Sequence, residues 1–157
     1  MRALAFAAGV LWALPNTLLG LLAGLAALPF GARLHWRPRE LALVFQRYPW
    51  GPGGALTLGN VILHTGERLD VACRTYAHRA GLAEEAPVSL AAHERAHVLQ
   101  AMALGPLFLP LYLACGGVSA SNRFERAADH YARSGRGWWP WSAVERPEES
   151  PTNGPPP

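Results

Sequence analysis

The stretch His93-Glu94-Arg95-Ala96-His97 decides the expected fold, because it has the H-E-x-x-H spacing of a metal-binding helix. On a helix, positions i and i+4 stand one turn apart on one face, so the two imidazoles can bind a single ion. Glu94 is rotated from that face by about 100°, which lets its carboxylate approach a metal-bound water without binding the metal. Ser89 suits the N-cap, and Leu90–Leu104 contains neither Gly nor Pro, so this context predicts a helix.

A second motif lies downstream, in the segment from Asn122 to Arg133. A catalytic zinc site needs three protein ligands and one open position for water. Glu125 on a second helix would supply the third ligand. Asp129, one turn later on the same face, can accept a hydrogen bond from the far ring nitrogen of a zinc-bound histidine and so fix its tautomer. The alternative is a solvated amphipathic helix in which both carboxylates pair with arginines of the same segment.

H-E-x-x-H followed by E-x-x-A-D at residues 125–129 resembles the gluzincin metallopeptidases. Among them, the pattern is most similar to the membrane-embedded HtpX-like and CAAX-prenyl-protease group, in which a hydrophobic segment separates the two zinc-binding helices. The resemblance covers mainly residues 54–133. It implies that Zn²⁺ is the cofactor, that its ligands are the two motif histidines and Glu125, that Glu94 is the general base, and that Asp129 supports a ligand histidine.

Charge is scarce in this chain: half of its 157 residues are hydrophobic and 16% are charged, whereas about 25% is usual for soluble domains. This composition excludes a disordered, highly charged regulator. The net charge is +3, but every basic residue is Arg, and the arginines are scattered rather than gathered into one stripe. We therefore expect no nucleic-acid partner.

The longest uncharged stretch runs from Ala3 to Ala32. As a helix rising about 1.5 Å per residue, it exceeds the hydrocarbon thickness of roughly 30 Å, so one tilted span fits. A break at Pro15-Asn16 would instead give two re-entrant helices, and a signal peptide is a third interpretation, for which the apolar run is long. We expect residues 1–32 to anchor the chain in the cell membrane. Three arginines follow at positions 33, 37 and 39, which favours a cytoplasmic catalytic part.

A second uncharged stretch, residues 98–122, joins the two expected metal-binding helices. By composition alone it would pass as another transmembrane segment. His97 and Glu125 must each place a ligand atom roughly 2 Å from one ion, and a single crossing would leave them on opposite sides of the membrane. We therefore predict a shallow helical hairpin, with Gly105-Pro106 and Pro110 as its turn or kink residues.

The expected fold is mainly α and membrane-associated, with zincin-like helices carrying the two motifs. A short β-hairpin is predicted at residues 55–64, around Gly59-Asn60. Its edge either holds an extended peptide or is a small structural ribbon. Residues 33–133 would form a minimal metallopeptidase domain. Residues 134–157 hold three tryptophans, either an interfacial anchor or a clamp on the domain, followed by a disordered Pro-rich tail.

These observations predict a membrane-associated zinc endopeptidase that acts on a membrane or membrane-proximal polypeptide. His130 and Tyr131 follow Asp129 and are candidate donors to the oxyanion. A catalytically silent zinc-binding membrane scaffold is the alternative, although an intact Glu94 argues against it, because a purely structural site needs no base. A chance match to the motif is a third interpretation.

Overall fold

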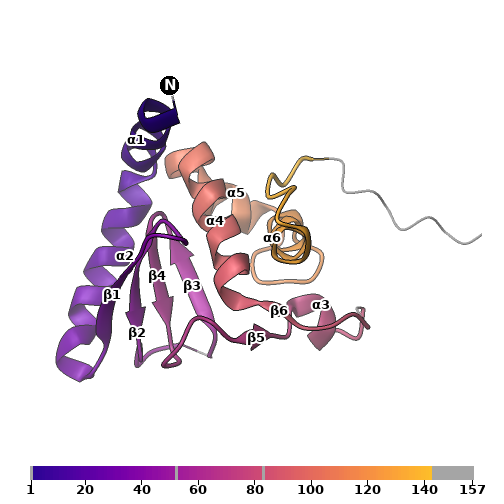
Figure 1. Ribbon diagram of the computed structural model, residues 1–157, viewed down its shortest axis with the longest axis horizontal. Coiled ribbons are helices and arrows are strands. Elements are labelled where there is room, and N and C mark those ends of the chain that lie inside the picture. Colours follow the sequence, from indigo (N-terminus) through magenta and orange to yellow (C-terminus); the bar gives the residue numbers. More distant parts are fainter. Residues whose placement is uncertain (1, 52, 83, 143–157) are drawn as a thin grey trace, which may run out of the picture.

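The computed structural model describes residues 2–51, 53–82 and 84–142, which form a small mixed β-sheet between two layers of helices (Figure 1). About half of the described residues are helical. The expectation of a mainly α fold with one hairpin was therefore too simple, because it missed the four strands outside the hairpin. The Pro-rich end of the predicted tail lies outside the described residues.

The sheet has four strands in the order β1-β2-β4-β3. Their bounds are β1 Arg33–Arg37, β2 Ala42–Gln46, β3 Ala55–Leu58 and β4 Val61–His64. Strands β3 and β4 form the predicted antiparallel hairpin, which is confirmed. Strand β2 runs parallel to β4 and antiparallel to β1. Strand β3 is therefore an edge of the sheet, and this edge lies beside the helix that carries His93 and His97.

The central strands β2 and β4 are largely buried on both faces, and their alternate side chains point to opposite layers. Val44 and Ile62 pack with Leu90 and Val98 of α4 (Leu90–Leu104). On the other face, Phe45 and its neighbours on β4 pack against α2 (Leu14–Ala27). One core therefore holds the sheet against α4, and the other holds it against α2.

The N-terminal stretch folds as α1 (Arg2–Trp12), α2 and a 3₁₀ turn, η1 (Leu28–Phe30). The axis bends by 63° between α1 and the segment from Leu14 to Phe30, and this bent pair is apolar and long enough to cross a membrane. Helix α2 lies close to the sheet, since a Cβ added at Gly24 would collide with the Phe45 ring. The bend falls at Ala13, two residues before the break considered from the sequence.

Helix α4 is followed by η2 (Gly105–Leu107) and α5 (Phe108–Ala114). By length and composition, the run from Leu90 to Ala114 is apolar enough to cross a membrane. It is not one rod, because Gly105 has a φ of 58°, a left-handed conformation that favours glycine. The Tyr112 ring lies 6.1 Å from the His97 ring, whereas fifteen residues of straight helix would separate them by about 22 Å. The chain therefore turns back at Gly105-Pro106.

Helix α6 (Arg123–Ser134) begins after a second turn and packs against α4. Asn122 caps it: its side-chain oxygen accepts from the backbone N–H of Phe124, and its amide donates to the carbonyls of Tyr112 and Gly117. This one side chain fixes where α6 starts relative to α5.

Three short elements complete the fold: β5 (Ala72–Cys73), α3 (Tyr76–Arg79) and β6 (Val88–Ser89). Beyond α6, Trp138 packs with Ala96 and Tyr131, and the Trp141 ring lies 5.5 Å from Phe124. These contacts support the clamp interpretation of the tryptophans over the interfacial one.

Candidate metal centre

Helix α4 presents His93 and His97 on one buried face. The Ser89 hydroxyl accepts from the backbone N–H of Ala92 and caps the helix, as the sequence predicted. The two histidines are 9% and 6% exposed. Their Nε2 atoms lie 3.1 Å apart, so both ring nitrogens point at one position in space.

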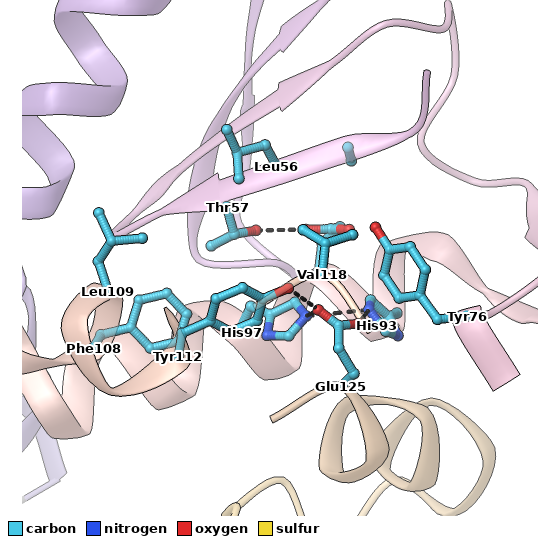
Figure 2. Close-up of a pocket in the computed structure, with 12 residues that line it drawn as sticks. Leu56, Thr57, Tyr76, His93, His97, Phe108, Leu109, Tyr112, Val118 and Glu125 are labelled. Carbon is cyan, nitrogen blue, oxygen red and sulfur yellow. Dashed lines mark hydrogen bonds and ion pairs between the residues drawn. The ribbon is translucent and has the colours of Figure 1, made fainter. Parts of the chain in front are cut away.

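Helix α6 brings Glu125 to the same position, because Ala96 of α4 and Ala128 of α6 are both fully buried and let the helices approach closely. The Glu125 carboxylate lies 3.1 Å from His93 Nε2 and 3.5 Å from His97 Nε2 (Figure 2). Ligand atoms at about 2.0–2.1 Å around a tetrahedral ion are separated by about 3.3 Å. Glu125 Oε2 lies near this spacing from His93 Nε2, and Glu125 Oε1 lies near it from His97 Nε2. One ligand atom from each of the three residues lies within 4.8 Å of the other two, so the group can hold a metal ion.

Glu125 Oε2 supports this fit, because it is buried and forms no hydrogen bond among the described residues, although His93 Nε2 lies 3.1 Å away. When the His93 proton is on Nδ1, both of these atoms are acceptors and neither can donate to the other. A buried carboxylate oxygen without a partner is costly. A cation between this oxygen and the two imidazoles would satisfy it. The donor set of two imidazole nitrogens and one carboxylate is that of catalytic zinc sites with an open fourth position.

The far nitrogen of each imidazole also has a partner. His93 Nδ1 lies 2.9 Å from Asp129 Oδ1, the residue predicted for this contact. His97 Nδ1 lies 2.8 Å from Gln100 Oε1. An acceptor at Nδ1 keeps the proton there and leaves Nε2 free for a metal. Gln100 was missed from the sequence, although a polar residue one turn after His97 in an apolar helix was a usable signal.

Tyr112 is a further residue that sequence reasoning missed. Its hydroxyl donates to Glu125 Oε1, and α5 carries it there only because the chain reverses at Gly105. Burial and the neighbouring Glu125 carboxylate raise the pKa of Tyr112 far above its ordinary value, so it stays protonated and remains a donor. It thereby orients the third ligand.

In the metal-free site, the close approach of histidine and carboxylate groups shifts the pKa values of Glu125 and His93. Burial opposes charge on Glu125, but the two histidines outweigh it and hold the pKa of this carboxyl well below its ordinary value. Burial likewise disfavours protonated His93, yet Asp129 and Glu125 raise its pKa well above the ordinary value. The site therefore favours a positive charge between these groups, which a metal cation supplies.

Glu94 lies in the cleft beside the triad and is 4% exposed. Its Oε2 accepts a hydrogen bond of 2.6 Å from the hydroxyl of Thr57 on edge strand β3. In Figure 2, β3 passes above the site with Thr57 pointing down toward it. The carboxylate is thus held at the cleft, next to the metal-binding face rather than on it.

The two predicted oxyanion donors do not line this cleft. His130 is exposed and faces Gly137, and Tyr131 packs with Ala96 and Ala128 where α4 and α6 meet. The hydroxyl-bearing rings that do line the cleft are Tyr76 and Tyr112.

Comparison with known proteins finds no protein-family model, curated protein or solved structure that matches this chain.

Proposed function

We propose that this chain is a membrane-associated, zinc-dependent endopeptidase of the gluzincin type, resembling the HtpX-like and CAAX-prenyl-protease group. The observation that carries the proposal is the convergence of His93, His97 and Glu125 on one position, with Glu94 beside it in an open cleft. A site that only stabilised the fold would need no unligated carboxylate there. The ligand set favours zinc over the harder cations, which prefer all-oxygen sites.

The chemistry assigned to the chain is a proton transfer by Glu94. A zinc ion held by the triad would lower the pKa of a bound water and polarise the scissile carbonyl. Glu94 takes one proton from the attacking water as the oxygen–carbon bond forms. It then passes this proton to the amine as the carbon–nitrogen bond breaks, and returns to the carboxylate form. Thr57 holds the carboxylate in the orientation that this transfer needs.

The substrate we propose is a polypeptide held extended along β3. This strand pairs only with β4 in the described sheet, and residues 55–57 line the cleft. An open strand edge offers main-chain hydrogen bonds that do not depend on the peptide's side chains. This geometry favours the substrate-binding interpretation of the hairpin over the purely structural one.

We further propose that α1 and α2 contact the lipid bilayer. Their polar side chains point inward: the Asn16 amide donates to the Gly105 carbonyl, and the Thr17 hydroxyl accepts from the backbone of Asn60. The outward face instead carries exposed leucines, among them Leu18 and Leu22 at 50% and 67% exposure. Polar groups inward and apolar groups outward are typical of helices in lipid. The bend and the packing of α2 on the sheet favour the re-entrant form of the anchor. The three arginines at positions 33, 37 and 39 favour an active site on the cytoplasmic side.

Two measurements on one pair of proteins test this proposal. The full chain and its Glu94→Gln variant are purified in detergent, their zinc content is measured, and cleavage of casein and of a membrane-protein substrate is followed. We expect about one zinc in each protein and cleavage by the wild type alone. Zinc in both without cleavage by either identifies the silent scaffold instead. Absence of zinc from both shows that the motif is accidental, and full activity of Glu94→Gln refutes the proposed base.

A further inference from the structure

The cleft at Glu94 continues past the metal-binding residues on both sides. Two adjoining hollows share four lining residues, namely Ala55, Tyr76, His93 and Glu94. Because the scissile bond must lie at Glu94, a bound peptide extends from one hollow into the other. The two hollows therefore receive opposite flanks of the substrate.

One hollow contains the metal-binding triad and is apolar at one end. This end is lined by Phe108 and Leu109 of α5 and by Val118 from the turn before α6. Figure 2 shows Phe108 and Leu109 grouped at one end of this cleft, and Tyr76 at the opposite end. Val118 is 66% exposed, so an apolar side chain of a ligand would remove its surface from water.

The other hollow is basic. It is lined by Gly53 and Gly54 before β3 and by a polar run that includes Thr75, Arg74 and Arg79. The guanidinium of Arg79 lies over the Tyr76 ring, 5.6 Å from its centroid, and so toward the cleft. Stacking on an aromatic face leaves the edge N–H groups of a guanidinium free to bind a carboxylate.

The basic hollow has no acidic residue paired to it among the described residues. Neither Arg74 nor Arg79 forms an ion pair there, and both are exposed. Glu85, on the segment after α3, pairs with Arg133 at 2.9 Å instead. The positive charge at this end is thus available to a ligand.

We infer that the proposed peptidase selects substrates with apolar side chains on one side of the scissile bond and a carboxylate on the other, the carboxylate being bound by Arg79. This inference rests on the proposed function for the position of the scissile bond. The carboxylate is either an acidic side chain or the C-terminus of a peptide, since both offer the same two oxygens to a guanidinium. Arg79 is a specificity residue, because it lies beyond the reacting atoms.

Peptide binding to the zinc-loaded Glu94→Gln protein tests this inference without requiring hydrolysis. Three kinds of fluorescent peptide share one apolar core. Two of them have an amidated C-terminus and carry either Glu or Gln at one end. The third carries a neutral residue there and has a free C-terminal carboxylate. The Glu and Gln peptides are made with the variable residue at either end of the core. Dissociation constants are measured by anisotropy, and repeated after adding Arg79→Gln or, as a matched control on the outer side of α6, Arg126→Gln.

We expect a carboxylate at one end to tighten binding about tenfold over its neutral counterpart, as one added charge-assisted hydrogen-bond pair would. Arg79→Gln should abolish the difference and leave the neutral peptide's affinity unchanged, whereas Arg126→Gln should preserve it. The comparison of Glu with the free C-terminus identifies the source of the carboxylate. Equal affinities for all peptides, or discrimination that survives Arg79→Gln, overturn the inference. Failure of the wild type to cleave any of these peptides counts against the proposed function instead, and leaves the binding comparison valid.

Discussion

Gln100 Oε1 lies 2.8 Å from His97 Nδ1, and the amide nitrogen of the same side chain donates to the carbonyls of Phe124 and Trp138. Gln100 is fully buried. The two carbonyls fix which way the amide points, because only its NH₂ group can donate to them. The oxygen is therefore directed at His97, and this one side chain links α4, α6 and the tryptophan segment at the metal centre.

Replacing Gln100 should weaken metal binding. Gln100→Leu keeps a similar volume but leaves His97 Nδ1 without its acceptor, so we expect zinc affinity to fall about 10–100-fold. Competition with a chromophoric chelator measures the affinity, and circular dichroism checks the fold. Met102→Leu, on the same helix, is the matched control and should bind zinc as the wild type does. Unchanged affinity in a folded Gln100→Leu protein would show that this contact does not orient the ligand.

The pH dependence of zinc binding should report on Asp129. In the metal-free chain, burial disfavours the protonated form of His93, but contact with Asp129 and Glu125 outweighs burial and raises the pKa of His93 well above its ordinary value. Protons therefore compete with the metal for this histidine. Affinity should fall as the pH drops through that raised value. Asp129→Asn removes one of the carboxylates, lowers this pKa and shifts the fall to lower pH, while weakening binding at high pH. Superimposable pH profiles for the two proteins would contradict this assignment.

The same shift has a consequence for the stability of the metal-free protein. A raised pKa means that the folded state holds the His93 proton more tightly than the unfolded chain does. This contribution to the free energy of unfolding is complete below the ordinary histidine pKa of about 6.5 and is lost as the pH rises through the raised value. Urea titrations of the metal-free wild type and Asp129→Asn at several pH values should show a smaller pH effect in the variant.

Thr57 should act on turnover rather than on metal content. Thr57→Val removes the hydrogen bond to Glu94 at nearly constant volume, and we expect kcat to fall about tenfold with KM little changed, the equivalent of one lost hydrogen bond. Thr57→Ser keeps the hydroxyl and should restore most of the rate. Zinc content should be equal in all three proteins. A rise in KM alone would indicate that Thr57 shapes the peptide-binding edge and does not position the base.

The outer face of α2 should determine membrane attachment. Leu18→Gln combined with Leu22→Gln makes this face polar without touching the buried side that packs on the sheet. We expect the double variant to float less with liposomes and to be released from membranes by salt and carbonate. Val71→Gln, at an exposed site on the loop before β5, is the control. Liposome flotation equal to that of the wild type would contradict lipid contact at this face.

The local part of the site could be predicted from the sequence. The spacing of His93 and His97 needs only a helix to bring the rings together, and Glu125 and Asp129 share a face for the same reason. We predicted that the chain turns back between the two metal-binding helices, because His97 and Glu125 must reach one ion. In the structure the chain turns at Gly105.

The other features of the fold and the site depend on contacts between segments that are far apart in the sequence. Strand β2 pairs in parallel with β4 across a loop, and no local pattern in its short apolar run specifies that partner. Thr57 and Tyr112 reach Glu94 and Glu125 through the packing of β3 and α5, which spacing does not encode. His130 and Tyr131, the candidate oxyanion donors, are not among the residues that line the cleft, because they are rotated by about 100° and 200° from Asp129 on the same helix.

X-ray absorption spectroscopy of the zinc-loaded chain tests the proposed metal centre, because it reads the ligands of the metal itself. We expect one zinc with two imidazole nitrogens and one carboxylate oxygen at about 2.0–2.1 Å, and an exchangeable water in the fourth position. Glu125→Ala should remove the carboxylate from this shell, and Glu94→Gln should leave the three protein ligands unchanged. A sulfur ligand, four protein ligands, or a shell that changes with Glu94→Gln would rule out the proposed centre.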